Sequence, residues 1–358
     1  MDGLLGKEYL KNYIKNVKSI INNYLKNEEE KAKDVGKIPA EAVEHFNNLA
    51  AEGKGIRGCL VSLGYEANGG TKMENIYETS TFIEIFHSGV LVHDDFMDRD
   101  NKRRGVETLN SIYKKYGEKI KVKTDPLHYG NSMAVSVGDA TLYMSWEILL
   151  NSNFPPERII EAGKIYAKYV IRLAHGQVLD ITSGAHEDIT EKEVLNILWT
   201  KSGEYTSLLP LMVGATLVGD IPEKRKKAIE NYARCFGWAF QIQDDYLGIF
   251  GEEEETRKPI TSDLREGKNT LFMFNLRKLG NNEQKAFQSS VLGREDVTKD
   301  DVYKMREILR DSGTLNNVLK KGWAYVEEGK KYIGDITDDK NMQNIFESLL
   351  VFMMERTK

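Results

Sequence analysis

Cysteine and proline are both scarce in this chain of 358 residues. Cys59 and Cys235 are too few for a disulfide framework and wrongly spaced for a zinc site, so we expect buried thiols in a reducing compartment, the cytoplasm. The 7 prolines leave few helix breakers, and helix is therefore the expected default. Positive charge is not in excess either, because 50 basic against 55 acidic side chains give a net charge of −5, which argues against a nucleic-acid partner.

Long uninterrupted apolar runs are also missing. The longest, residues 208–218, contains Pro210 and Gly214 and is too short to cross a hydrocarbon layer of about 30 Å. Residues 1–20 alternate charged and apolar side chains at helical spacing, unlike a signal peptide. We therefore expect a soluble protein with no stable membrane anchor.

Apolar residues recur at three and four positions along most of the chain, which is the period of a helix. The clearest stretches are 9–24, 83–92, 133–150, 159–173, 194–198, 229–249 and 318–333. Alternating β-branched runs beside Asn-Gly or Asp-Gly are missing, so we expect no hairpin. Turn signals such as Asn68-Gly69-Gly70 and Thr124-Asp125-Pro126 separate helices, and none is typical of a linker. The sequence predicts one all-α domain over 1–358, with its motifs in about 50–275 and further helices over 276–358.

Three aspartates, Asp94, Asp95 and Asp98, follow a strongly apolar stretch in the segment LVHDDFMDRD. Residues 94 and 98 are four apart, so on a helix their carboxylates share one face, about 6 Å apart at Cβ, and need a compensating cation. The simplest cation is a divalent metal, and magnesium takes one or two carboxylates together with substrate phosphate. Taken alone, the cluster also fits a solvated acidic turn.

A second acidic pair, Asp244 and Asp245, ends another apolar helical stretch in the segment GWAFQIQDDYLGIF. Two such clusters predict facing halves of one metal site in a helical bundle. Several cations stand beside glycines, which let the backbone approach an anion while the side chains wrap it. These cations are Lys54 and Arg57 in GKGIRG, Arg103 and Arg104 in NKRRG, and Lys258 and Lys268 in RKPITSDLREGKNT. Together they indicate a metal-bridged phosphate or diphosphate.

The order of these motifs resembles that of the trans-prenyl diphosphate synthases, and within them the archaeal-type geranylgeranyl diphosphate synthases. The motifs GKGIRG, HSGVLVHDDFMDRDNKRRG, AHGQVLD, TKSGEYTSLLP, FQIQDDYLGIFG and KPITSDLREGKNT occur in the family's order between residues 53 and 270. The resemblance implies an all-α bundle around a deep central cavity, as a homodimer. It also implies the reaction, in which isopentenyl diphosphate attacks the cation left by an ionised allylic diphosphate (dimethylallyl, geranyl or farnesyl).

The resemblance further implies a role for each matching residue. Magnesium ions would be held by Asp94, Asp98 and Asp244, with Asp95 and Asp245 as outer partners. The allylic diphosphate would be held by Arg103, Lys201, Lys258 and Lys268. Isopentenyl diphosphate would be held by Lys54, Arg57, His87 and Arg104. The dipoles of Gln241 and of the Lys201-Ser202 carbonyls would stabilise the allylic cation, and Asp263 would act with Lys268 on a closing loop.

The sequence departs from the family pattern at two positions near these motifs. Gly248 stands where many relatives have the third aspartate of the second motif, which removes an outer ligand and keeps the first. Ser202 stands where a threonine is common, and it keeps the hydroxyl group. Because DDxxG forms also belong to the family, we expect activity to survive both departures.

Product length in this family is set by bulky side chains below the first aspartate motif. Gly89 is the fifth residue before Asp94, where short-chain members place an aromatic ring, so the floor of the cavity is not expected there. Phe86 lies one helical turn earlier and is the candidate floor, which predicts a C20 product or one isoprene unit more, C25. That Phe86 is ordinary core, and that the product is longer, both stay open.

Three other functions fit parts of the pattern. A class I terpene cyclase has a DDxxD motif but needs no isopentenyl diphosphate site, so it would form product from one diphosphate. A regulatory subunit of a heteromeric synthase would have a broken first motif, which is whole here. A metal phosphohydrolase centred on His93 and Asp94 would need more histidine ligands, for which only His128 and His175 have a plausible context, and it would release phosphate without chain growth.

Overall fold

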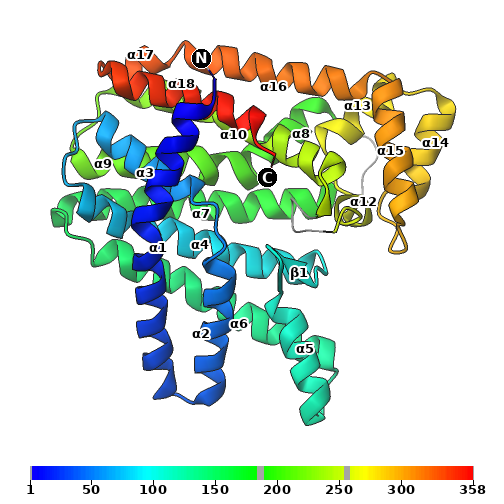
Figure 1. Ribbon diagram of the computed structural model, residues 1–358, viewed down its shortest axis with the longest axis horizontal. Coiled ribbons are helices and arrows are strands. Elements are labelled where there is room, and N and C mark those ends of the chain that lie inside the picture. Colours follow the sequence, from blue (N-terminus) through cyan, green and yellow to red (C-terminus); the bar gives the residue numbers. More distant parts are fainter. Residues whose placement is uncertain (1, 184–188, 254–258, 358) are drawn as a thin grey trace. The chain divides into compact units, whose positions relative to one another are not determined.

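The computed structural model describes residues 2–183, 189–253 and 259–357, and helices dominate them (Figure 1). The expectation of an all-α fold is therefore confirmed. The chain divides into two compact units, of which the larger comprises Met1–Tyr9, Leu63–Gly70 and Lys164–Lys358, and the smaller comprises Leu10–Ser62 and Thr71–Gly163. That the whole chain forms a single domain around a central cavity stays a prediction.

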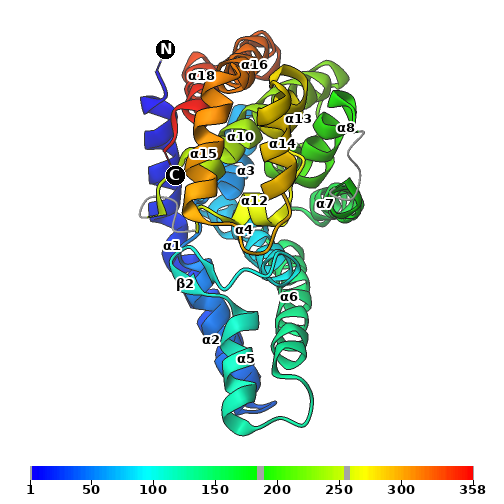
Figure 2. The same ribbon diagram turned by 90° about the vertical axis from the view of Figure 1, so that its right-hand side faces the viewer.

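The smaller unit is built on a helix whose middle part is buried on all sides. Its elements are α1 (Leu4–Lys33, mainly in this unit), α2 (Lys37–Ala50), the first half of α3 (Ile56–Ala67), α4 (Met73–Met97), β1 (Lys102–Arg103), β2 (Val106–Glu107), α5 (Leu109–Ile120) and α6 (Pro126–Leu150). Phe82, Ile83, Ile85 and Phe86 of α4 are all completely buried. Such a helix must be covered on every face; α6 packs along it, and α5 packs on α6 (Figure 2).

The predicted turn before α6 is present, and the structure shows how it starts the helix. Asp125 caps the helix, because its Oδ2 accepts a hydrogen bond of 3.0 Å from the backbone N–H of His128. Pro126 occupies the first turn, where its missing N–H is harmless. The sequence signals therefore fix where α6 begins.

The expectation that the chain has no hairpin is wrong. Strands β1 and β2 pair antiparallel, with Lys102 opposite Glu107 and Arg103 opposite Val106. The two-residue turn between them has positive φ at both positions, 53° at Arg104 and 83° at Gly105, which is the pattern of a type I′ turn. The usual sequence signal is Asn-Gly or Asp-Gly, and Arg-Gly replaces it here.

The larger unit is organised around a long helix, α10 (Glu223–Phe250), which packs against several others (Figure 1). The other elements are α7 (Pro156–Ser183, mainly in this unit), α8 (Glu191–Ile197), η1 (Leu198–Leu208), α9 (Leu209–Val218), α12 (Ser262–Glu266), α13 (Leu271–Leu279), α14 (Asn282–Val291), α15 (Lys299–Asp311), α16 (Thr314–Lys330), α17 (Ile333–Ile336) and α18 (Lys340–Glu355). Tyr232 joins α10 to α18, because its hydroxyl donates a 2.8 Å hydrogen bond to the carbonyl of Phe346.

Element η1 is a π-helix of 11 residues, a rare form with wider turns than an α-helix. Glycines let its neighbours approach its backbone closely. A Cβ at Gly176 of α7 would lie 2.4 Å from the backbone nitrogen of Lys201, and one at Gly237 of α10 would lie 2.8 Å from the Cα of Gly203. The backbone that carries Lys201 is therefore clamped by α7 and α10.

Cys59 and Cys235 are both buried, as expected, and no disulfide joins them. Along the parts of the chain that the structure describes, none of the helices has both the length and the apolar character that a bilayer span requires.

Candidate active site

The first aspartate cluster lies at the carboxyl end of α4. Asp94 and Asp95 occupy its last turn, and Asp98 caps it, with its N–H donating a 2.8 Å hydrogen bond to the carbonyl of Asp94. The helix dipole is negative at this end, so carboxylates here are unfavourable without a nearby cation. The geometry therefore requires positive charge beside these side chains.

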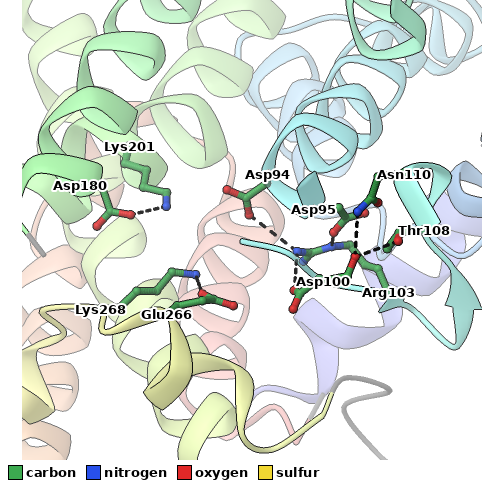
Figure 3. A network of polar contacts seen from close by, with 10 residues as sticks. All are labelled: Asp94, Asp95, Asp100, Arg103, Thr108, Asn110, Asp180, Lys201, Glu266 and Lys268. Carbon is green, nitrogen blue, oxygen red and sulfur yellow. Dashed lines mark hydrogen bonds and ion pairs between the residues drawn. The ribbon is translucent and has the colours of Figure 1, made fainter. Parts of the chain in front are cut away.

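Arg103 of β1 supplies such a charge (Figure 3). Its Nε donates to Oδ1 of Asp95, and its Nη2 lies 3.3 Å from Oδ2 of Asp100 and 3.7 Å from Oδ2 of Asp94. Asp100 is itself fixed, because Thr108 Oγ1 donates a 2.8 Å hydrogen bond to its carbonyl. Sequence reasoning missed Asp100, although it belongs to the same acidic segment. The hairpin thus serves to bring Arg103 back to the end of α4.

Asp95 is the buried member of the first cluster, with a side chain only 1% exposed. Burial raises the pKa of its carboxyl group to about 7, although the charge of Arg103 opposes the shift. Its second oxygen, Oδ2, is buried and accepts no hydrogen bond from any residue that the structure describes. An oxygen in this state suits a hard cation.

The four residues expected to bind isopentenyl diphosphate lie in the smaller unit and act on one another. Burial, followed by the charges of Arg57, Arg104, Arg103 and Lys54, holds the pKa of His87 well below its usual value. Arg104 lies next to Arg103 but contacts other groups, since its Nη1 donates a 3.0 Å hydrogen bond to the carbonyl of Leu49. The neighbouring arginines therefore serve different partners.

Glu84 is a further residue of this region that sequence reasoning missed. Its carboxylate is buried and accepts a 2.7 Å hydrogen bond from the backbone N–H of Gly58, in the first turn of α3. The segment before that turn contains Gly55, whose φ of 68° is rarely adopted by other residues. A pocket of about 220 Å³ borders the same segment and is lined by Gly53, Gly55, Glu84 and one face of α1.

The second aspartate pair lies in the last two turns of α10. Asp244 is half exposed, whereas Asp245 is buried and its Oδ2 has no hydrogen-bond partner in the described chain. Burial raises the pKa of Asp245 well above its usual value, and the charges of Asp263 and Asp244 act in the same direction. Gln241 donates a 2.9 Å hydrogen bond to Oδ1 of Asp245 and thereby orients it.

Lys201 and Lys268, expected at the allylic diphosphate, each lie beside a carboxylate of the larger unit (Figure 3). Lys201 donates to Oδ2 of Asp180, the last residue of the AHGQVLD motif, and Lys268 forms an ion pair with Glu266. Neither carboxylate was singled out from the sequence. Lys258, the remaining residue of this group, lies outside the described residues.

Asp263 of α12 lies directly beside Gly248 of α10. A Cβ at Gly248 would lie 1.8 Å from Oδ2 of Asp263, so the carboxylate from α12 fills the space that the glycine leaves. The departure at residue 248 is therefore accompanied by a carboxylate from another element.

The two residues expected to control product length lie in the packed part of α4. Phe86 is completely buried. Gly89 faces α6, because a Cβ there would lie 1.7 Å from Oγ1 of Thr141. The assignment of Phe86 as the cavity floor stays a prediction.

His93 contacts α6. Its Nε2 lies 3.3 Å from Oδ1 of Asp139 and 3.3 Å from the carbonyl of Val135. Among the residues that the structure describes, no group of three potential metal ligands includes a histidine. This arrangement gives the phosphohydrolase reading no support.

Each aspartate pair, taken within its own unit, fits a hard divalent cation such as magnesium. The side chains are carboxylates, and in each pair the buried member, Asp95 or Asp245, has an Oδ2 without a hydrogen-bond partner within the described residues. Carboxylate oxygens are the ligands that such ions prefer, and thiols and imidazoles are not needed.

Comparison with known proteins decides the family. Residues 39–309 match the family model described as polyprenyl synthetase. The chain belongs to the polyprenyl synthetase family. It is 27% identical to the geranylgeranyl diphosphate synthase of Sulfolobus acidocaldarius, over 84% of each chain. It is 28% identical to the geranylfarnesyl diphosphate synthase of Aeropyrum pernix, over 87% of this chain and 92% of that one.

A solved structure has the same fold. The geranylgeranyl pyrophosphate synthase from Corynebacterium glutamicum, in complex with isoprenyl diphosphate and magnesium, superposes with a TM-score of 0.89 and 24% identity. The match covers 97% of this chain and 99% of that one. This likeness confirms the isoprenoid synthase fold that the motifs imply.

Proposed function

We propose that this protein is a prenyl diphosphate synthase that condenses isopentenyl diphosphate with an allylic diphosphate and makes geranylgeranyl diphosphate, C20. The observation that carries the proposal is that the charges of Lys54, Arg57 and Arg104 all act on His87, in the same unit as the first aspartate cluster. Such a group of cations suits a second diphosphate, which a terpene cyclase does not need. The relatives that make C20 and C25 products support the same chemistry.

The chain's own residues divide this work as the motifs predict. Asp94, Asp98 and Asp244 are the proposed ligands of magnesium, which when bound would neutralise the charge of the departing diphosphate. Arg103, Lys201, Lys258 and Lys268 are proposed to hold that diphosphate. Gln241 points its amide at Asp245 and is proposed to keep that carboxylate oriented toward the cation site.

A homodimer in the cytoplasm is the proposed state of the enzyme. Helix α6 exposes large apolar side chains, and Val135, Tyr143 and Leu150 recur at intervals of seven and eight residues, which places them on one side of the helix. An exposed apolar face of this kind suits a twofold interface between identical chains. The two buried cysteines, which no disulfide joins, fit a reducing compartment. Light scattering after gel filtration tests the dimer, and Tyr143→Glu is expected to weaken it.

The decisive experiment supplies magnesium, isopentenyl diphosphate and one starter at a time, either dimethylallyl, geranyl or farnesyl diphosphate. The products are dephosphorylated and the alcohols separated by chromatography. We expect chain growth to C20 with every accepted starter, and none when a chelator removes the metal. Product from an allylic diphosphate alone would favour a cyclase, and an alcohol of C25 would correct the product length.

A further inference from the structure

Arg356, the residue that directly follows α18, reaches the second aspartate pair. Its Nη2 donates a 3.0 Å hydrogen bond to the carbonyl of Phe240 and lies 3.1 Å from Oδ1 of Asp244. The guanidinium side chain is only 2% exposed, whereas that of Asp244 is 50% exposed. The motifs assign no role to any residue of this part of the chain.

Several contacts with α10 hold Arg356 in place. Its carbonyl accepts a 2.7 Å hydrogen bond from Nε2 of the buried Gln243, and its guanidinium carbon lies 4.4 Å from the centre of the Phe240 ring, a cation–π distance. Its Nε and Nη1 are buried without hydrogen-bond partners among the described residues. A buried, partly unsatisfied charge destabilises a fold, and an apolar side chain would tie α18 to α10 at lower cost.

The first aspartate cluster has a comparable arginine. Arg103 comes from outside α4 and lies against the carboxylates at the end of that helix, as Arg356 comes from outside α10 and lies against Asp244. In both cases an arginine from another element contacts a carboxylate in the carboxyl-terminal part of a helix. The repetition in separate units points to a role at the carboxylate, beyond packing.

We infer that Arg356 is a positioning residue for Asp244. It holds Oδ1 from the buried side, so that the carboxylate presents its other oxygen to the metal in a fixed orientation. This inference rests on the proposed function, in which Asp244 binds magnesium. Outer partners that orient ligating carboxylates commonly change metal affinity or activity by about 10–100-fold when they are removed.

The test compares three variants of the full chain. Arg356→Met keeps the length of the side chain and removes its charge and donors, and Arg356→Lys keeps the charge without the planar fork. The control is Tyr232→Phe, which removes another hydrogen bond between α10 and α18, the one to Phe346. Two quantities are measured: the magnesium concentration that gives half-maximal condensation, and the rise in thermal unfolding midpoint caused by magnesium with inorganic pyrophosphate.

For Arg356→Met we expect about tenfold more magnesium at half-maximal activity and a smaller rise of the midpoint with magnesium pyrophosphate. Arg356→Lys should have a magnesium requirement and a midpoint rise between those of Arg356→Met and the parent. If Arg356→Met does not fold, the comparison of Arg356→Lys with the parent is the test. Tyr232→Phe should lower the midpoint without metal by a few degrees and leave the magnesium requirement unchanged.

Two results would overturn the inference. An unchanged magnesium requirement in Arg356→Met, with only a lower unfolding midpoint, would mean that the arginine only links the two helices. A lower magnesium requirement would mean that the arginine competes with the metal for Asp244. If the parent protein condenses nothing, but magnesium pyrophosphate stabilises it and Arg356→Met weakens that effect, the proposed function fails and the role of Arg356 stands. Absence of any magnesium effect on the parent would remove Asp244 as a ligand and the inference with it.

Discussion

Gly89 of α4 and Thr141 of α6 lie so close together that a methyl group at residue 89 would come within 1.7 Å of Thr141 Oγ1. Helices α4 and α6 can approach in this way only because residue 89 has no side chain. Thr141 Oγ1 is also fixed, since it donates a 2.6 Å hydrogen bond to the carbonyl of Gly138. A substitution at residue 89 therefore acts on helix packing before it acts on any substrate.

We predict that Gly89→Ala lowers the free energy of unfolding by about 1–3 kcal/mol, the usual cost of overpacking a core. The loss should be smaller when Thr141 is changed to Gly, because the opposing hydroxyl and methyl groups are then absent. Urea denaturation of the two single variants and the double variant gives the coupling between the residues. Equal losses in both backgrounds would contradict this account of the contact.

Phe86→Ala is expected to lengthen the product, if the ring closes the end of the cavity. It should also cost about 3–5 kcal/mol of stability, because the ring is completely buried. Phe82→Ala, one turn away on the same helix and equally buried, is the matched control for that loss. Product lengths are measured by supplying labelled isopentenyl diphosphate and separating the products by chromatography. An unchanged distribution in Phe86→Ala would show that Phe86 is ordinary core.

Asp94→Ala and Asp244→Ala should each reduce condensation by about 10³-fold or more, as expected for loss of a metal ligand that stabilises the leaving group. Both side chains are partly exposed, at 20% and 50%, so the helical circular-dichroism signal should not change. Asp139→Ala, at an exposed aspartate of α6 beside His93, provides the control and should keep its activity. Substantial turnover by either variant would remove that residue from the metal site.

Glu84→Ala is predicted to raise the KM for isopentenyl diphosphate by about fivefold or more, while the KM for the allylic substrate changes little. The reason is that the N–H of Gly58 loses its acceptor, Oε1 of Glu84, at the turn that carries Arg57. Glu84→Gln keeps an acceptor oxygen and should show a smaller effect. Steady-state kinetics with each substrate varied in turn separates the two constants, and equal changes in both would indicate general misfolding.

His87 should make the free energy of unfolding depend on pH. Its pKa in the folded chain is held well below the unfolded value of about 6.5. Below that pH, His87 therefore binds a proton in the unfolded chain but stays neutral in the folded chain. The stability is therefore complete above pH 6.5 and falls as the pH drops below it, by up to about 1.4 kcal/mol per pH unit. His87→Gln removes this contribution. Urea midpoints at pH 7.5 and 5.5 should differ more for the parent than for the variant.

The sequence could predict the helices and the two aspartate clusters because each rests on a local pattern. The apolar period of residues 83–92 and 229–249 places both clusters near the ends of α4 and α10, as the structure has them. The capping signal at Asp125 and Pro126 is equally local. Features whose physical cause lies within a few neighbouring residues could therefore be predicted from the sequence.

The features that the sequence did not reveal depend on contacts between distant segments. The hairpin escaped because its turn is Arg-Gly, and η1 escaped because its apolar residues keep a helical spacing although the backbone is wider. Arg356 escaped because residues 340–355 read as an ordinary amphipathic helix, and only packing on α10 brings the arginine to Asp244. Asp263 beside Gly248 is a contact of the same kind.

The wide spiral of η1 has a consequence for anyone who engineers this enzyme. Residues 198–208 look like a place where better helix-forming residues would add stability, because Gly203 and several β-branched or aromatic side chains lie there. Tightening this segment into ordinary turns would rotate Lys201 away from Asp180 and press new side chains into α7 and α10. Consensus design should therefore leave residues 198–208 unchanged, because their wide π-helical backbone sets the direction of the Lys201 side chain.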